Sequence, residues 1–178
     1  MLSTGEGGFL LTDIEEYEQK SRSYSRFGNL NGIDFGLNYK LSSVQAALGI
    51  NRLDLLAEQL TKRRLNAEYI VTNLTNPAVS EFQIINGGNP NYYFLLLRLH
   101  FKDNKRFIDY LDENGIPSDI KRYGCKALYE FPRLKDFRRP CPNAENLLNT
   151  VTTIPVHPGI TQRDLEHIVT VINEYKLD

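Results

Sequence analysis

Residues 36–49 read Gly-Leu-Asn-Tyr-Lys-Leu-Ser-Ser-Val-Gln-Ala-Ala-Leu-Gly, and this stretch decides how the first part of the chain is interpreted. It joins a loop to a helix. Residues 28–41 hold three glycines and three asparagines, which favour turns, but they are too apolar for a flexible linker. Because Ser42 is a residue type preferred at helix N-caps, we predict a helical region from Ser42 to Leu74, with a bend near Gly49.

Upstream of this loop, the sequence predicts one strand and one helix. Residues 8–12, Gly-Phe-Leu-Leu-Thr, are apolar and bounded by turn residues, which predicts a short buried strand. Asp13 and Glu16 form a D-x-x-E capping pattern, so a helix is expected from Ile14 to about Arg26. A single strand cannot make a sheet, so this part of the chain is expected to need a sheet from elsewhere.

The second part of the chain alternates strands with helices. Strands are expected at residues 79–85, 92–101, 116–120 and 151–155, and helices are expected to begin at Asp103, Asn143 and Thr161. This order predicts an α/β (α+β) subdomain in which helices cover a small sheet. The expected division of the chain is therefore residues 1–76 and residues 77–178.

Composition indicates which partners the chain does not bind and in which cellular compartment it is expected. The 178 residues carry 21 basic and 22 acidic side chains, and this balance argues against binding to nucleic acid or to an anionic membrane. The apolar stretches are strand-sized, and residues 1–25 show no secretion-signal pattern. Cys125 and Cys141 have no CxxC spacing, which favours free thiols in a reducing compartment over a disulfide or a metal pair. We therefore expect a cytoplasmic protein.

Four segments, taken in order, resemble the DegT/StrS-type sugar aminotransferases, which depend on pyridoxal phosphate (PLP). They are residues 2–13, residues 36–49, residues 115–123 with their Gly-Ile-Pro and Lys-Arg-Tyr, and residues 154–161, Ile-Pro-Val-His-Pro-Gly-Ile-Thr. The resemblance covers essentially the whole chain. It implies the C-terminal half of a fold-type-I PLP transferase. Residues 1–76 would be the tail of the large PLP-binding domain with long connecting helices, and residues 77–178 the small C-terminal domain.

The resemblance also implies where the cofactor would be held. The family's Schiff-base lysine is expected immediately upstream of Met1, so no catalytic residue is assigned within the chain. Asn38 matches the asparagine that, in the family, reaches across the dimer interface to the PLP phosphate of the partner subunit. An amide NH2 group can donate to a phosphate oxygen. The alternative is that Asn38 only stabilises a glycine-rich turn.

Three further residues are candidates for substrate binding. Lys40 stands where the family has an arginine, which keeps the positive charge but loses the planar, two-pronged donor. Arg122 and Tyr123 match an Arg-Tyr pair and could border a sugar-nucleotide pocket. The alternatives are a solvated lysine, a surface salt bridge and a core tyrosine.

The three histidines, His100, His157 and His167, lack metal-ligand spacing, so no metal site is expected.

Two functions remain open from the sequence. In the first, the chain is part of an enzyme that aminates a nucleotide-linked keto sugar for polysaccharide biosynthesis, with glutamate as donor and PLP as cofactor. It would work as a homodimer or with a separate N-terminal half, and the isolated chain would be inactive. In the second, the chain is a non-catalytic oligomerisation or binding module derived from such an enzyme.

Overall fold

The computed structural model describes residues 2–177. The chain forms two compact units, Met1–Ala57 and Glu58–Asp178. The expected division at residue 76 refers to the domains of a whole aminotransferase and stays a prediction. Within this chain, all but the first two residues of helix α3 (Leu56–Asn73) belong to the second unit.

The first unit contains α1 (Glu15–Tyr24), the short 3-10 helix η1 (Gly28–Leu30) and α2 (Ser43–Asp54). The predicted strand at residues 8–12 is wrong: these residues are not in a strand, and Phe9 and Leu11 are 92% and 91% exposed. The physical reason is the lack of a partner strand. An apolar strand is stable only beside another strand, and the unit's described residues contain none.

Helix starts in this unit follow the predicted capping only in part. Ser42 caps α2 as expected, because its hydroxyl accepts from the Gln45 amide while the Gln45 side chain accepts from the Ser42 amide. The Asp13–Glu16 pattern does not form a cap. Ile14 occupies the N-cap position, and its amide donates instead to the Thr12 hydroxyl at 3.1 Å. The helical region predicted from Ser42 to Leu74 is interrupted at Leu55, between α2 and α3, and α2 runs through Gly49 without a break.

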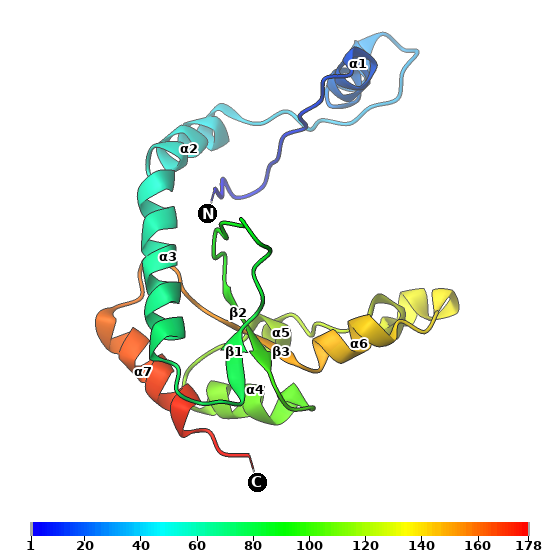
Figure 1. Ribbon diagram of the computed structural model, residues 1–178. Helices are drawn as coiled ribbons and strands as arrows, with labels where there is room; N and C mark the ends of the chain where they lie inside the picture. The colour runs from blue at the N-terminus through cyan, green and yellow to red at the C-terminus, as the bar shows by residue number, and fades with distance from the viewer. Residues whose placement is uncertain (1, 178) are drawn as a thin grey trace. The chain divides into compact units, whose positions relative to one another are not determined.

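The second unit is built on a three-stranded antiparallel sheet in the order β1-β2-β3 (Figure 1). The strands are β1 (Val79–Glu81), β2 (Leu95–Leu99) and β3 (Val151–Ile154), with Val79 opposite Leu99 and Leu95 opposite Ile154. The helices are α3, α4 (Asn104–Glu113), α5 (Asp119–Arg122), α6 (Pro142–Leu148) and α7 (Gln162–Glu174), with 3-10 turns η2 (Leu128–Glu130) and η3 (Pro132–Phe137).

One hydrophobic core joins the sheet to α3, α4 and α7. Alternate residues of β2 point into it, so Leu95, Leu97 and Leu99 are buried while Arg98 is exposed. The helices contribute the fully buried Ala67, Ile70, Phe107, Leu111 and Ile172. Helices therefore cover a small sheet, which confirms the predicted α/β class.

Several boundaries and one element differ from the prediction. The strands expected at 79–85 and 92–101 are confirmed in shortened form, because the connection from Phe82 to Phe94 is irregular and Tyr92 takes a left-handed φ of 45°. The strand expected at 116–120 is wrong. Its last two residues instead begin the single turn of α5, which spans residues 119–122. The caps predicted at Asp103 and Thr161 are confirmed by their hydrogen bonds to the Lys105 and Asp164 amides.

Candidate functional site

The loop between α1 and α2 closes on itself and holds Asn38 at its base. The Leu37 amide donates to the Tyr24 carbonyl at 2.8 Å, and the Tyr39 amide donates to the Ser25 carbonyl at 3.1 Å. Arg26 and Asn38 form an isolated antiparallel bridge between these bonds. The backbone of Asn38 is therefore fixed from both sides, although the residue lies in a loop.

Two glycines permit this closure. An added Cβ at Gly28 would lie 1.9 Å from the Asp34 carbonyl oxygen, and one at Gly36 would lie 2.3 Å from the Gly28 amide nitrogen. Gly28 also has a left-handed φ of +62°. The two ends of the loop can approach this closely only where neither residue carries a side chain.

An asparagine turn completes the interior of the loop. The Asn31 side-chain oxygen accepts from the Ile33 and Asp34 amides at 2.9 and 3.0 Å, and its nitrogen donates to the Asp34 carboxylate at 3.0 Å. Asparagine commonly stabilises turns in this way. Because the loop's polar groups bond to one another, the side chains of Ile33 and Phe35 lie outward and are 87% and 76% exposed.

Asn38 itself keeps a hydrogen-bond donor available. Its side-chain oxygen accepts from the Lys40 amide at 3.4 Å, and the side chain is exposed. Among residues 2–177, no acceptor engages its NH2 group. This group fits a phosphate oxygen, which only accepts hydrogen bonds. A PLP phosphate needs several donors, so Asn38 fits as one member of a larger set.

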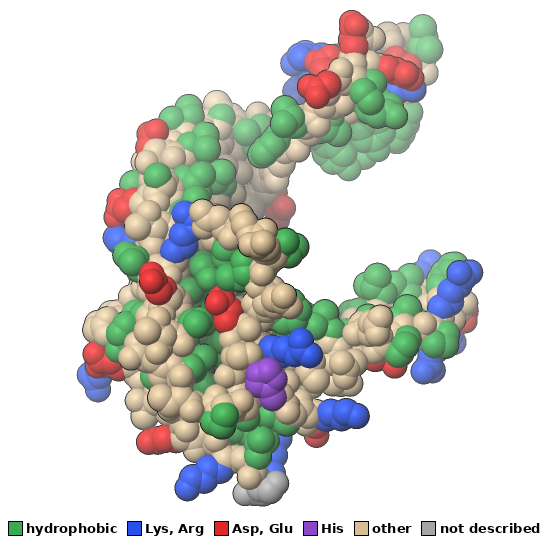
Figure 2. All heavy atoms as spheres, in the orientation of Figure 1, with side chains coloured by type: hydrophobic (Ala, Val, Ile, Leu, Met, Phe, Trp, Pro, Cys, Tyr) green, Lys and Arg blue, Asp and Glu red, His purple; other side chains and the backbone are tan. Residues whose placement is uncertain are grey.

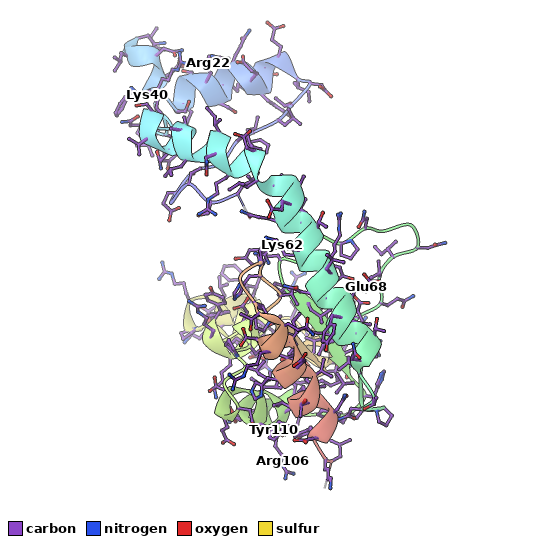
Figure 3. All side chains as sticks on the ribbon, turned by 90° about the vertical axis from the view of Figure 1, so that its left-hand side faces the viewer. Arg22, Lys40, Lys62, Glu68, Arg106 and Tyr110 are labelled. Atoms are coloured by element: carbon purple, nitrogen blue, oxygen red, sulfur yellow. The ribbon has the colours of Figure 1, made fainter. Side chains whose placement is uncertain are left out.

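Lys40 lies between this loop and α2. Figure 3 labels it just before the start of that helix, with Arg22 on neighbouring α1. Arg22 pairs with Glu18 on its own helix, whereas Lys40 is exposed and has no ion pair within the described part of the chain. Its charge is therefore available to an anionic ligand. Tyr39 contacts the Tyr24 ring, with centroids 5.9 Å apart, and so takes part in packing.

Arg122 and Tyr123 lie together at the end of α5 in the second unit. The Arg122 guanidinium carbon is 5.5 Å from the centroid of the Tyr123 ring, and Tyr123 is 66% exposed. Tyr123 is therefore not the core tyrosine of the alternative interpretation. The structure thus brings Asn38 next to Lys40 in one unit and Arg122 next to Tyr123 in the other.

Neighbouring Lys121 has a structural role instead. Its ammonium group lies 2.8 Å from the Asp109 carboxylate and 2.7 Å from that of Asp112, both on α4. Hydrogen bonds to these two carboxylates raise the pKa of Lys121, so it remains charged at neutral pH. Lys121 ties α5 to α4.

The lysines of the chain lack the burial typical of a Schiff-base lysine. All nine lysines of the chain are exposed, and Lys20 and Lys62 pair with glutamates one helical turn away. A lysine that attacks a carbonyl is commonly activated by burial or by a second cation beside it. Burial of this kind is absent from all nine.

The other chemical groups of the described chain are dispersed. Cys125 and Cys141 are free and exposed. His100 bonds to the Ser80 hydroxyl and His167 to the Asn114 carbonyl. Across residues 2–177, no three His, Cys, Asp or Glu side chains gather in a way that could hold a metal ion. Within the same residues, no helix combines the length and apolar character needed to cross a membrane.

A group of buried polar residues in the second unit was not predicted from the sequence. Arg63 is 7% exposed and donates to the Tyr92 and Tyr93 carbonyls at 3.1 and 2.8 Å. Its spacing from Ala67 and Ile70 places it on the buried face of α3. This spacing was the signal in the sequence that indicated the burial of Arg63. Ser118, Thr152 and Thr153 are also buried, and nothing in their local sequence indicates it.

Comparison with known proteins gives one consistent result. The chain is 26% identical to dTDP-4-amino-4,6-dideoxy-D-glucose transaminase of Shigella dysenteriae over 188 residues, covering 99% of this chain and 50% of the relative. It is 28% identical to UDP-4-amino-4,6-dideoxy-N-acetyl-beta-L-altrosamine transaminase of Campylobacter jejuni over 180 residues, covering 94% and 47%. The chain therefore spans about half the length of the curated relatives it matches.

The fold is shared with solved sugar aminotransferases. The crystal structure of the sugar aminotransferase CalS13 from Micromonospora echinospora superposes with a TM-score of 0.83 at 21% identity, covering 97% of this chain and 48% of the other. The model of the DegT/DnrJ/EryC1/StrS aminotransferase family matches residues 1–173. The resemblance drawn from the four sequence segments is confirmed, and the chain belongs to the DegT/DnrJ/EryC1/StrS aminotransferase family.

Proposed function

We propose that the chain is the C-terminal part of a PLP-dependent aminotransferase that aminates a nucleotide-linked keto sugar. Family membership supports the reaction class, and the dTDP- and UDP-sugar transaminases among its relatives support the substrate class. The observation that carries the proposal is the closed loop that fixes Asn38 and leaves its NH2 group without a partner in the described chain.

The residues divide between cofactor and substrate. Asn38 donates to the PLP phosphate, and Lys40 attracts a phosphate of the nucleotide as a point charge. Arg122 and Tyr123 border the nucleotide sugar. The Arg122 guanidinium would attract the charged groups of the ligand, and the Tyr123 ring would pack against its flat groups. Bound PLP would supply the electron sink that transamination requires. Glutamate is the proposed amino donor.

The Schiff-base lysine is proposed to lie outside these 178 residues, as the family resemblance implies, and the exposure of all nine lysines here agrees with this. A polypeptide of these residues alone is therefore proposed to be inactive. The lysine-bearing half would be joined to this chain or supplied separately. Both free thiols are compatible with the cytoplasmic location proposed from the sequence.

We also propose that the first unit pairs with a second copy of the chain. Figure 2 shows charged side chains over α1 and hydrophobic ones gathered beside them. The exposed apolar side chains of this unit include Phe9, Leu10, Leu30, Ile33 and Phe35. Surfaces of this kind mark interfaces. Burying about 1,000 Å² of apolar surface contributes on the order of 25 kcal/mol before entropic costs are subtracted.

The alternative is a non-catalytic module that keeps the family's fold. One assay separates the two functions. These residues, together with the lysine-bearing half encoded in frame or beside them, are incubated with PLP, glutamate and nucleotide-linked keto sugars. The aminotransferase proposal predicts an aminated sugar nucleotide and 2-oxoglutarate, and loss of both products when Asn38 is changed to Asp. A protein that binds no PLP and aminates none of the sugars would favour the module.

A further inference from the structure

The turn that carries Arg122 and Tyr123 is held by side chains of other elements. α5 has four residues, and one helical turn is not stable alone. Ser118 stands at its N-cap position, but its hydroxyl does not cap the helix. Instead, the amide of Asp119 donates to the Thr153 hydroxyl of β3 at 2.8 Å. A residue 34 positions away in sequence therefore satisfies the first amide of the turn.

Three buried hydroxyl groups form this attachment. Thr152 donates to the Ser118 hydroxyl at 3.1 Å, and the Ser118 and Thr153 hydroxyls are 3.3 Å apart. Thr152 is 0% exposed, Ser118 is 2% exposed and Thr153 is 5% exposed. These hydroxyls join residues 118 and 119 to β3, the edge strand of the sheet, within the segment where the sequence predicted a strand at residues 116–120.

A second attachment holds the same turn from its other side. Lys121 pairs with Asp109 and Asp112 on α4. The turn then closes after Tyr123, where Gly124 takes a φ of +57° and the Cys125 amide bonds to the Ile120 carbonyl at 2.9 Å. The backbone on both sides of Arg122 and Tyr123 is therefore fixed, while Tyr123 itself is 66% exposed.

We propose that Thr153, together with Ser118 and Thr152, positions the Arg122–Tyr123 pair for binding of the nucleotide sugar. The inference rests on the proposed function, because it needs that pair to contact the substrate. A buried hydroxyl network of this kind orders the binding groups before the ligand arrives. Less conformational freedom is then lost on binding. Thr153 is a positioning residue, and it does not touch the substrate.

The test compares two threonine variants in the protein assembled with its lysine-bearing half. Thr153→Val keeps the shape of the side chain and removes the hydroxyl that holds α5. Thr150→Val is the matched control, since the Thr150 hydroxyl bonds to the Asn146 and Leu147 carbonyls of α6 instead. We expect Thr153→Val to raise KM for the nucleotide sugar about fivefold, the factor that one hydrogen bond typically contributes. kcat and KM for glutamate should not change.

Two more variants test the same positioning role. Thr153→Ser retains the hydroxyl and should restore KM to the wild-type value. Lys121→Met releases α5 from α4 at the surface, where loss of folding is not expected, and it should raise KM for the nucleotide sugar as Thr153→Val does. Hydrogen exchange across residues 119–125 should become faster in both Thr153→Val and Lys121→Met, and not in Thr150→Val.

Arg122→Ala separates this inference from the proposed function. If Arg122→Ala raises KM for the nucleotide sugar while Thr153→Val and Lys121→Met leave it unchanged, the positioning role is wrong and the substrate role of Arg122 stands. If Arg122→Ala also leaves KM unchanged, the pair does not bind the substrate and both statements fail. An equal rise in KM in Thr150→Val would show a general loss of structure and would also contradict the inference.

Discussion

At the scale of single residues, Asn38 carries the proposed contact with the cofactor. Its oxygen bonds to the Lys40 amide and its NH2 group remains available, so replacing it removes a donor without leaving a buried group unsatisfied. In the assembled enzyme, Asn38→Ala should weaken PLP binding about tenfold, which is typical of a hydrogen bond to a charged group. Asn38→Asp should weaken it further, because a carboxylate repels the phosphate.

Fluorescence titration with PLP measures these affinities. Asn51→Ala, on an exposed position of α2, is the control and should bind PLP as the wild type does. Equal PLP affinity in Asn38→Asp and the wild type would exclude this contact and would leave Asn38 as a turn residue only.

Tyr92 makes a second residue-scale prediction, on the pH dependence of stability. Burial, followed by its hydrogen bond to Glu81, raises the pKa of Tyr92 from 10.0 to about 12. The folded state therefore holds this proton more tightly than the unfolded state does. The resulting stability is fully present below pH 10 and is lost as the pH rises from about 10 to about 12.

Tyr92→Phe removes this titrating group while it keeps the ring. Thermal unfolding at pH 8 and at pH 11 should show the wild type losing more of its Tm than the variant between these two values. A loss of the same size in both proteins would mean that Tyr92 does not hold its proton more tightly in the folded state.

At the scale of elements, the closed loop depends on the approach of Gly36 to Gly28. Gly36→Ala would place a methyl group 2.3 Å from the Gly28 amide nitrogen and 2.5 Å from the Tyr24 carbonyl oxygen, so the loop must open. Gly8→Ala is a matched control in the same unit, since nothing lies within 4 Å of its added Cβ and its φ is not left-handed.

Hydrogen exchange at the Leu37 and Tyr39 amides reports loop closure directly, because both donate across its base. We expect exchange at both amides to accelerate in Gly36→Ala and to stay unchanged in Gly8→Ala. The same change should weaken PLP binding in the assembled enzyme. Unchanged exchange in Gly36→Ala would show that the loop is not closed in this way.

The sequence predicted elements well where local patterns decide them. The caps at Ser42, Asp103 and Thr161 form as expected because each depends on residues within one turn of it. The strand at residues 8–12 was wrong because a strand needs a partner that the described chain does not supply. The strand at 116–120 was wrong because hydroxyls from β3, distant in sequence, hold that segment as a turn.

The candidate site was predictable to a similar extent. Asn38 and Lys40 could be proposed as site residues because they lie in one distinctive stretch of sequence. The residues that hold Arg122 and Tyr123 in place were not found, since a buried threonine in a short strand has no local signature. The spacing of Arg63 from Ala67 and Ile70 was a signal in the sequence, but arginine is rarely buried, and the burial of Arg63 was not predicted.

At the scale of the whole molecule, the exposed apolar side chains of the first unit predict self-association. Phe35 and Phe137 are each 76% exposed, the first on the loop beside Asn38 and the second in η3 of the other unit. Phe35→Asp should place a charge in the proposed interface and shift the protein toward monomer, whereas Phe137→Asp should not. Light scattering at micromolar concentration measures the mass of each. A monomeric wild type would contradict the interface.

These residues are proposed to complete the active site of a sugar aminotransferase. The most direct measurement is amino transfer by the chain assembled with its lysine-bearing half, with and without Asn38→Asp, using glutamate and a nucleotide-linked keto sugar. We expect an aminated sugar nucleotide from the wild type, a severe loss in the variant, and no product from the 178 residues alone. The proposal would be contradicted if these residues alone turned over the substrate, or if the assembled protein bound PLP and left every keto sugar nucleotide unchanged.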